Sequence, residues 1–185
     1  MELKPVMYQM GKMWDQTDAN ENFYVRYNTD VNGGAHWHDC FEIELVVGGS
    51  CCEVLNGVSI PVKKGDVTLI TPADLHEVHN IEALEIYNLM FTDAVIDEKI
   101  LNAILLNENS IISCHLDDED FEYVLNILRR ADKEYHTKEH DYERFVIDSI
   151  NQLLSIMLRH SETSTSNRKE LSIRTAAFYM KMSFN

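Results

Sequence analysis

The sequence has few cysteines, and their spacing is not typical of a disulfide framework or a thiolate metal site. The four cysteines are Cys40, Cys51, Cys52 and Cys114, and no two of them form a Cys-x-x-Cys pair. Small secreted proteins that depend on disulfides carry a denser set of cysteines. We therefore expect free, buried or half-buried thiols and a cytoplasmic protein.

Long hydrophobic segments are also missing. No apolar run reaches the length of about 18 residues that a membrane-spanning helix needs. The residues from Met1 to Pro5 lack the basic and apolar regions of a secretory signal peptide. Both absences agree with the expected cytoplasmic location.

Positive charge is scarce. The 185 residues contain 31 acidic and 16 basic side chains, which gives a formal net charge of −15. Such a chain repels nucleic-acid phosphates, so we expect no direct DNA binding by this polypeptide. Apolar residues make up 45% of the sequence, enough to form a core, so global disorder is not expected. The common enzyme motifs Gly-x-Ser-x-Gly, P-loop, Gly-x-Gly-x-x-Gly and His-Glu-x-x-His are absent.

The first half of the chain has the pattern of short strands separated by turns. Residues 41–47 alternate between apolar side chains and the acidic Glu42 and Glu44, which predicts a half-buried strand that ends at Gly48-Gly49. Asn56-Gly57 predicts a tight hairpin, because a type I′ turn needs two residues with positive φ. Further strands are expected at 23–27, 53–55, 58–60, 67–70 and 84–91. This succession predicts a sandwich or a small barrel.

Three histidines and a glutamate lie within this region. His36, His38 and Glu42 are separated by even numbers of residues, so they project from one face of an extended strand. His76 has to come from a neighbouring strand to join them. The four side chains either bind a divalent cation such as zinc, nickel, iron or manganese, or are structural hydrogen-bonding groups at the mouth of a polar pocket.

Three other residues are candidates for ligand binding. Glu44 shares the face of Glu42, and this face is either a binding surface or the solvated side of the strand. Trp37 and Tyr87 can stack on a sugar or an aromatic ligand, although an aromatic side chain on a strand more often packs in the core. We expect a polar small molecule, for which a sugar is one candidate.

After Thr92 the hydrophobic period changes to that of helices. A first helix is expected near residues 96–104, a second begins after the N-cap Asp117, and a third covers residues 145–160. The apolar residues of the third helix extend around more than one face, which predicts a helix buried on two sides and hence a homodimer. The predicted dimer contacts are Phe145, Ile150, Leu153, Leu154 and Met157.

Two motifs resemble those of the cupin superfamily. The first is His-x-His-x3-Glu-x6-Gly, formed by His36, His38, Glu42 and Gly49. The second begins at Gly65 and continues to His76 and Asn80. This resemblance implies a mainly β fold, a small jelly-roll-like barrel followed here by an α-helical hairpin. It also implies that His36, His38, Glu42 and His76 are the metal-ligand positions.

The order of a cupin-like barrel, a helix pair, a linker and one further amphipathic helix resembles the AraC family of bacterial transcription regulators. The resemblance implies a barrel at 1–92, a helical dimerisation region at 93–160, a linker at 161–170 and, at 171–185, the first helix of a truncated DNA-binding domain. In such a regulator a small-molecule effector in the barrel controls the helix-turn-helix domain, and DNA is contacted only through that domain.

These observations leave two hypotheses for the function. The first is the effector-binding and dimerisation domain of an AraC-type regulator, which is not an enzyme. The second is a small metal-dependent cupin enzyme, an isomerase or dioxygenase in which the cation polarises a carbonyl or binds oxygen. The helical hairpin and the final helix favour the first hypothesis, and an intact set of metal ligands favours the second.

Overall fold

The structure is a computed structural model that describes residues 6–9, 22–29, 31, 34–72, 74–107 and 111–161. The predicted helix at 171–185 and the predicted linker from residue 162 onward lie outside the described residues. The elements, in chain order, are β1 (Val6–Tyr8), β2 (Phe23–Asn28), β3 (His36–His38), β4 (Phe41–Leu55), β5 (Val58–Lys63), β6 (Asp66–Ile70), β7 (His76–Phe91), a 3-10 turn (Asp93–Val95), α1 (Glu98–Leu105), β8 (Ile112–His115), α2 (Asp118–Thr137) and α3 (Tyr142–Ser161).

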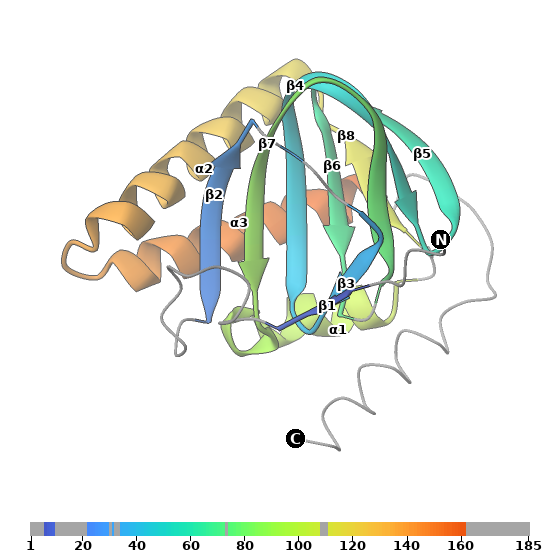
Figure 1. Cartoon of the computed structure of the whole chain (residues 1–185). Helices are drawn as coiled ribbons and strands as arrows, with labels where there is room; N and C mark the ends of the chain where they lie inside the picture. Colours follow the sequence, from blue (N-terminus) through green and yellow to red (C-terminus); the bar gives the residue numbers. More distant parts are fainter. Residues whose placement is uncertain are drawn as a thin grey trace.

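Two long antiparallel strands, β4 and β7, form the centre of the fold. They pair from Phe41 opposite Phe91 to Leu55 opposite His76. The remaining strands complete a sheet in the order β1-β3-β7-β4-β6-β8, with β2 added on β7 and β5 on β4. Both long strands arch over, so that their two halves belong to opposite walls of a barrel (Figure 1). The predicted mainly β fold, a small barrel followed by an α-helical hairpin, is confirmed.

The arch of β4 lies at the two glycines where the sequence predicted the strand to end. That prediction was wrong, because the strand continues through Gly48 and Gly49 with shifts in register between Val46 and Cys52. Gly49 has φ +69°, and a Cβ atom there would lie 2.2 Å from the carbonyl oxygen of Ala83. The glycine pair therefore bends the strand instead of terminating it.

The predicted hairpin turn is present between β4 and β5. Asn56 and Gly57 have φ values of 51° and 81°, as a type I′ turn requires. Among the strands that the structure describes, β5 pairs with β4 alone, so Pro61 lies on an edge strand, where its missing N–H is tolerated.

The outer face of the sheet carries the main hydrophobic core. Phe41, Ile43 and Leu45 of β4 are buried together with apolar residues of β7 and with the inner faces of α2 and α3. The two helices lie against this side of the barrel, as Figure 1 shows. Asp117 is the N-cap of α2 as predicted, since its side chain accepts a hydrogen bond from the Asp120 N–H at 2.9 Å.

The contact residues predicted for a dimer are mostly covered within the chain itself. Ile150, Leu153, Leu154 and Met157 each have 0% exposure, and only Phe145, at 48%, remains exposed. The prediction of these contacts assumed that one barrel could not cover the apolar residues of α3. That assumption was wrong, because α3 contacts α1, α2 and also β8, a strand that was not predicted within 93–160 and that pairs with β6.

No helix among the residues that the structure describes is long and apolar enough to cross a membrane. The structure describes all four cysteines and no disulfide joins them, as expected. Burial raises the pKa of Cys51 and of Cys114 to about 12, so both thiols are protonated at neutral pH.

Candidate functional site

The inner face of the barrel is built in three successive layers along β4. Residues that lie opposite each other in an antiparallel pair point to the same side of the sheet. Glu42 is opposite Ile70 and Met90, Glu44 is opposite Thr68 and Asn88, and Val46 is opposite Ile86. The interior therefore changes from a histidine and carboxylate layer, through a second polar layer, to an apolar layer. The apolar layer is formed by Val46, Cys51, Val62, Leu84 and Ile86.

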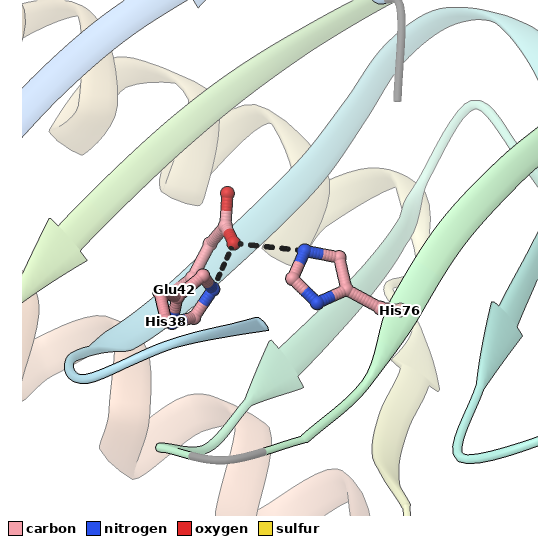
Figure 2. A group of neighbouring side chains, drawn as sticks. All are labelled: His38, Glu42 and His76. Carbon is pink, nitrogen blue, oxygen red and sulfur yellow. Dashed lines mark hydrogen bonds and ion pairs between the residues drawn. The ribbon is translucent and has the colours of Figure 1, made fainter. Parts of the chain in front are cut away.

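The first layer brings together three of the four predicted metal-ligand positions. Glu42 Oε2 lies 2.6 Å from His38 Nε2 and 3.4 Å from His76 Nε2. Figure 2 shows both rings pointing toward this carboxylate, His38 from β3 and His76 from the start of β7. All three side chains are at least 95% buried, since the largest exposure among them is 5%.

The contacts of the three side chains determine how they titrate. Burial lowers the pKa of His38, but the charge and the hydrogen bond of Glu42 raise this pKa by more than burial lowers it. The net pKa of His38 is therefore raised. His76 behaves in the same way. Burial alone would raise the pKa of Glu42, yet His38 and His76 hold it well below its usual range. Glu42 is therefore a carboxylate held between two histidines that are more basic than usual.

His36 does not join this cluster. Its Nδ1 lies 2.8 Å from the carbonyl oxygen of Gly34, and its ring packs on His76 with 4.0 Å between ring centroids. Burial and the neighbouring His76 lower the pKa of His36. The predicted set of four ligands is corrected to three, because the His36 ring is held beside the cluster instead of facing Glu42.

The remaining three residues have the composition and geometry of a divalent metal site. One ligand atom from each of His38, Glu42 and His76 lies within 4.8 Å of the others. Two histidines and one carboxylate are a common ligand set for non-haem iron and related ions. His38 Nδ1 also contacts the carbonyl oxygen of Cys40 at 2.8 Å, the kind of outer contact that orients a metal-bound imidazole. These residues therefore fit a divalent cation.

Glu44 occupies the second layer, as the sequence suggested. The Asn88 side-chain amide donates to Glu42 Oε1 and, at 3.5 Å, to Glu44 Oε1. Burial, Glu42 and Glu53 together raise the pKa of Glu44 to about 8. A large share of Glu44 is therefore neutral near pH 7.

Glu53 is a second carboxylate of this layer, and it was not among the predicted site residues. Its exposure is 2%, and it accepts a hydrogen bond from Thr68 Oγ1 at 3.0 Å. Burial raises the pKa of Glu53 in spite of this hydrogen bond. The alternation of Cys51, Glu53 and Leu55 is visible in the sequence, but the register shifts at the arch had to be known before it could be assigned to the interior.

The two aromatic candidates lie away from the interior. Tyr87 faces the outer side of the sheet, where it packs on Tyr27 with ring centroids 5.2 Å apart. Both tyrosines line a cleft of about 360 Å³ between the sheet and α2. Trp37 follows His36 and precedes His38 on β3, so it points to the opposite face from these histidines. Neither aromatic side chain is in the layer that holds Glu42.

Comparisons with known proteins agree with this architecture. The model of a family described as the AraC-like ligand binding domain matches residues 22–171. An apo variant of ToxT from Vibrio cholerae strain SCE256 has a TM-score of 0.56 at 12% identity, covering 89% of this chain and 66% of that chain. Wild-type ToxT from that strain with a bound unsaturated fatty acid has a TM-score of 0.51 at 12% identity, covering 89% and 64%.

A cupin 2 conserved barrel domain protein from Salinispora arenicola is 26% identical over 44% of this chain and 71% of its own, with a TM-score of 0.35. The present chain spans about two thirds of the length of the ToxT structures. No curated protein sequence matches the chain.

Proposed function

The chain belongs to the family of AraC-like ligand binding domains, and we propose that it senses a small-molecule effector inside the barrel and relays its presence to a DNA-binding domain of an AraC-type regulator. The observation that carries this proposal is the polar interior layer of a family-matched barrel, in which the buried oxygens Glu53 Oε1 and Asn88 Oδ1 have no hydrogen-bond partner among the described residues. Buried polar groups of this kind are typical of the few orienting contacts in a ligand site.

The strands give a physical route from the interior to the helices. Asn88 of β7 faces the inner layer, whereas its neighbour Tyr87 faces the cleft beside α2. A ligand that moves β7 therefore changes the packing on the helix side of the same strand. An effector with different affinities for two such arrangements shifts the equilibrium between them.

We propose the same domain order as the sequence suggested, with one revision. Residues 1–92 contribute most of the barrel, and 93–160 contribute the helical region together with β8. The linker at 161–170 and the helix at 171–185 lead to the DNA-reading domain. Contact with DNA belongs to that domain, because this chain is strongly acidic.

A homodimer remains part of this proposal, with a different surface. The stripe from Ile150 to Met157 is internal, so the contact has to use side chains of the hairpin that remain exposed. Tyr123 of α2 is 53% exposed and Phe145 of α3 is 48% exposed. These two residues are the apolar positions on which a symmetric helix contact can be centred.

Hydrogen exchange tests the sensing function. A panel of small metabolites is first screened for stabilisation of the chain against heating, because a ligand that binds the native state raises its stability. For each compound that binds, amide exchange is then compared with and without the compound. The proposal requires a change in exchange in α2 or α3, and binding confined to the barrel strands would contradict it.

A second candidate function rests on His38, Glu42 and His76. These residues would hold a divalent cation, which supplies Lewis acidity toward a carbonyl or carboxylate of a bound molecule. A metal-dependent isomerase or dioxygenase of the cupin type is the corresponding enzyme. Elemental analysis of protein purified without an affinity tag is the first test. Less than about a tenth of an equivalent of metal would leave the triad as a structural hydrogen-bonding group.

A further inference from the structure

We propose that the second layer of the barrel interior binds the ammonium group of an organic cation between Glu44 and Glu53, so that the ligand is an amine with an apolar body. This proposal rests on the proposed function only for the statement that this ligand is the effector. The binding site itself is argued from the described side chains.

The two carboxylates reach the same place from opposite walls of the barrel. Glu44 lies before the arch of β4, directly across from Thr68 on β6. Glu53 lies after the arch, and its carboxylate accepts a hydrogen bond from the Thr68 hydroxyl at 3.0 Å. Since side chains directly opposite on paired strands have Cβ atoms about 5 Å apart, Thr68 brings the two glutamates into one neighbourhood.

Two buried acceptor oxygens of this layer lack a hydrogen-bond partner among the described residues. These are Glu53 Oε1 and Asn88 Oδ1. Glu53 itself is 98% buried, given its exposure of 2%. A buried acceptor without a donor is costly, and a buried carboxylate more so. A ligand that supplies several N–H donors and a positive charge removes this cost.

Among the described residues, none forms an ion pair with Glu44 or Glu53, although the charge of His76 acts to lower the pKa of both and that of His38 acts to lower the pKa of Glu44. The charge of Glu42 is balanced by His38 and His76, which contact it directly. Arg26 is half-buried and lies opposite Asn88 in the strand register, but it forms no ion pair with Glu44 or Glu53. A bound ammonium group would supply N–H donors to these oxygens and would favour ionisation of the two carboxyl groups, whose pKa values are raised by burial.

The geometry favours an organic cation over a metal ion. In the described part of the chain, only His38, Glu42 and His76 have ligand atoms close enough together to surround one metal, and neither Glu44 nor Glu53 belongs to that group. The next layer is apolar, with Val46 and Ile86 from one wall and Cys51 and Val62 from the other. An ammonium group between the glutamates places the rest of the molecule beside these side chains. A sugar loses its expected stacking partners, because Tyr87 and Trp37 lie elsewhere.

The test uses three probes of similar shape and different charge. Calorimetric titration at pH 7.5 compares 2-phenylethylamine, 2-phenylethanol and 3-phenylpropionate with chain that has been dialysed against a chelator. We expect the amine to bind more tightly than the other two. Ethylamine and butylamine are included so that the result does not depend on the size of the apolar body.

The variants locate the binding site. Glu53→Gln and Glu44→Gln keep the side-chain shape and remove the charge, and each should weaken amine binding roughly tenfold or more, since a charge-assisted hydrogen bond is worth about 1.5–3 kcal/mol. The exposed Glu143→Gln is the matched control and should bind like the unmodified chain. Circular dichroism and thermal unfolding identify any variant that fails to fold. If one glutamate variant does not fold, the amine affinity of the other glutamate variant tests the site.

Three results would overturn the amine site. These are equal binding of alcohol and amine, preferential binding of the carboxylate probe, and failure of every amine to bind. The proposed sensing function is judged separately by hydrogen exchange in α2 and α3. Amine binding without a change of exchange in the helices would support the amine site and refute the sensing role. A neutral metabolite that changes exchange in the helices, while amines do not bind, would support the sensing role and refute the amine site.

Discussion

His38 Nε2 lies 2.6 Å from Glu42 Oε2, while Nδ1 of the same ring lies 2.8 Å from the carbonyl oxygen of Cys40. A carbonyl oxygen can only accept, so Nδ1 carries a proton. Nε2 faces an ionised carboxylate, which also requires either a proton on this nitrogen or a cation between the two atoms. The pair is therefore an imidazolium–carboxylate ion pair in the absence of metal, and a metal ion has to displace that proton.

The first prediction separates His38 from His36. Because His38 faces Glu42 and His36 does not, His38→Ala should abolish stoichiometric zinc or nickel binding, whereas His36→Ala should reduce the affinity by no more than about 10–100-fold, the range expected for outer residues. Elemental analysis after equilibrium dialysis measures both. A complete loss of metal in His36→Ala with an intact fold would restore the four-ligand site that the sequence predicted.

The second prediction concerns stability against pH. The folded-state pKa of Glu44 is raised from 4.5 to about 8, so the protonated form contributes stability that is fully present below 4.5 and lost as pH rises through 8. The raised pKa values of Glu53 and His38 act in the same direction. We expect the chain to melt at a lower temperature at pH 9 than at pH 6. The lowered pKa of Glu42 contributes stability above pH 4.5, and this contribution is lost only as pH falls below that value, so it does not affect the comparison of pH 6 with pH 9.

A variant isolates the contribution of Glu44 to this pH dependence. Glu44→Gln cannot ionise, so it should reduce the difference in Tm between pH 6 and pH 9 by roughly 3 °C or more, given that about 1 kcal/mol corresponds to 2–4 °C in a domain of this size. Glu143→Gln should keep the full difference. A Glu44→Gln variant with an unchanged pH profile would show that this carboxyl group ionises normally.

The third prediction compares two glycines with positive φ. Alanine in this conformation costs about 1–2 kcal/mol at either position. At Gly49 the added Cβ also meets the backbone of Ala83 at 2.2 Å, whereas at Gly57 no atom lies within 4 Å. Gly49→Ala should therefore unfold at a much lower denaturant concentration than Gly57→Ala. Equal destabilisation of the two variants would mean that the arch of β4 can relax around a side chain.

The fourth prediction distinguishes the helix core from a dimer surface. Leu153→Ala should cost about 2–5 kcal/mol of stability without changing the oligomeric state, because Leu153 is buried within the chain. Phe145→Glu should shift a dimer toward monomer while leaving the thermal stability of the fold nearly unchanged. Light scattering coupled to size exclusion measures both. A dimer that persists in Phe145→Glu would place the contact on another surface.

Local sequence signals were sufficient for many elements of the fold. The hairpin at Asn56-Gly57 and the N-cap Asp117 follow from the immediate backbone requirements of a turn and a helix terminus, so they could be predicted without knowledge of the tertiary structure. The cupin-like spacing of His38, Glu42 and His76 was likewise sufficient to identify three residues that come together. The prediction that His38 and Glu42 share one strand was wrong, because His38 lies on β3 and Glu42 on β4.

The predictions that failed depended on long-range packing. Glycines usually end a strand, and only the contact between Gly49 and Ala83 shows that this strand bends and continues. Glu53 could not be assigned to the interior before that bend was known. β8 has four residues, too few for a clear period, and without it the burial of Leu153 and Leu154 could not be anticipated.

The pairing of β4 with β7 also affects how fast the chain can fold. Its registered pairs join residues that are between 21 positions apart, for Leu55 with His76 (76 − 55), and 50 positions apart, for Phe41 with Phe91 (91 − 41). Pairing residues across such separations costs loop-closure entropy before most of the stabilising contacts form. Domains dominated by such long-range pairing fold in milliseconds to seconds. The β4–β5 hairpin, closed by a two-residue turn, can form within about 1–10 μs. We therefore expect refolding in which this hairpin forms early and the arched β4–β7 pair limits the rate.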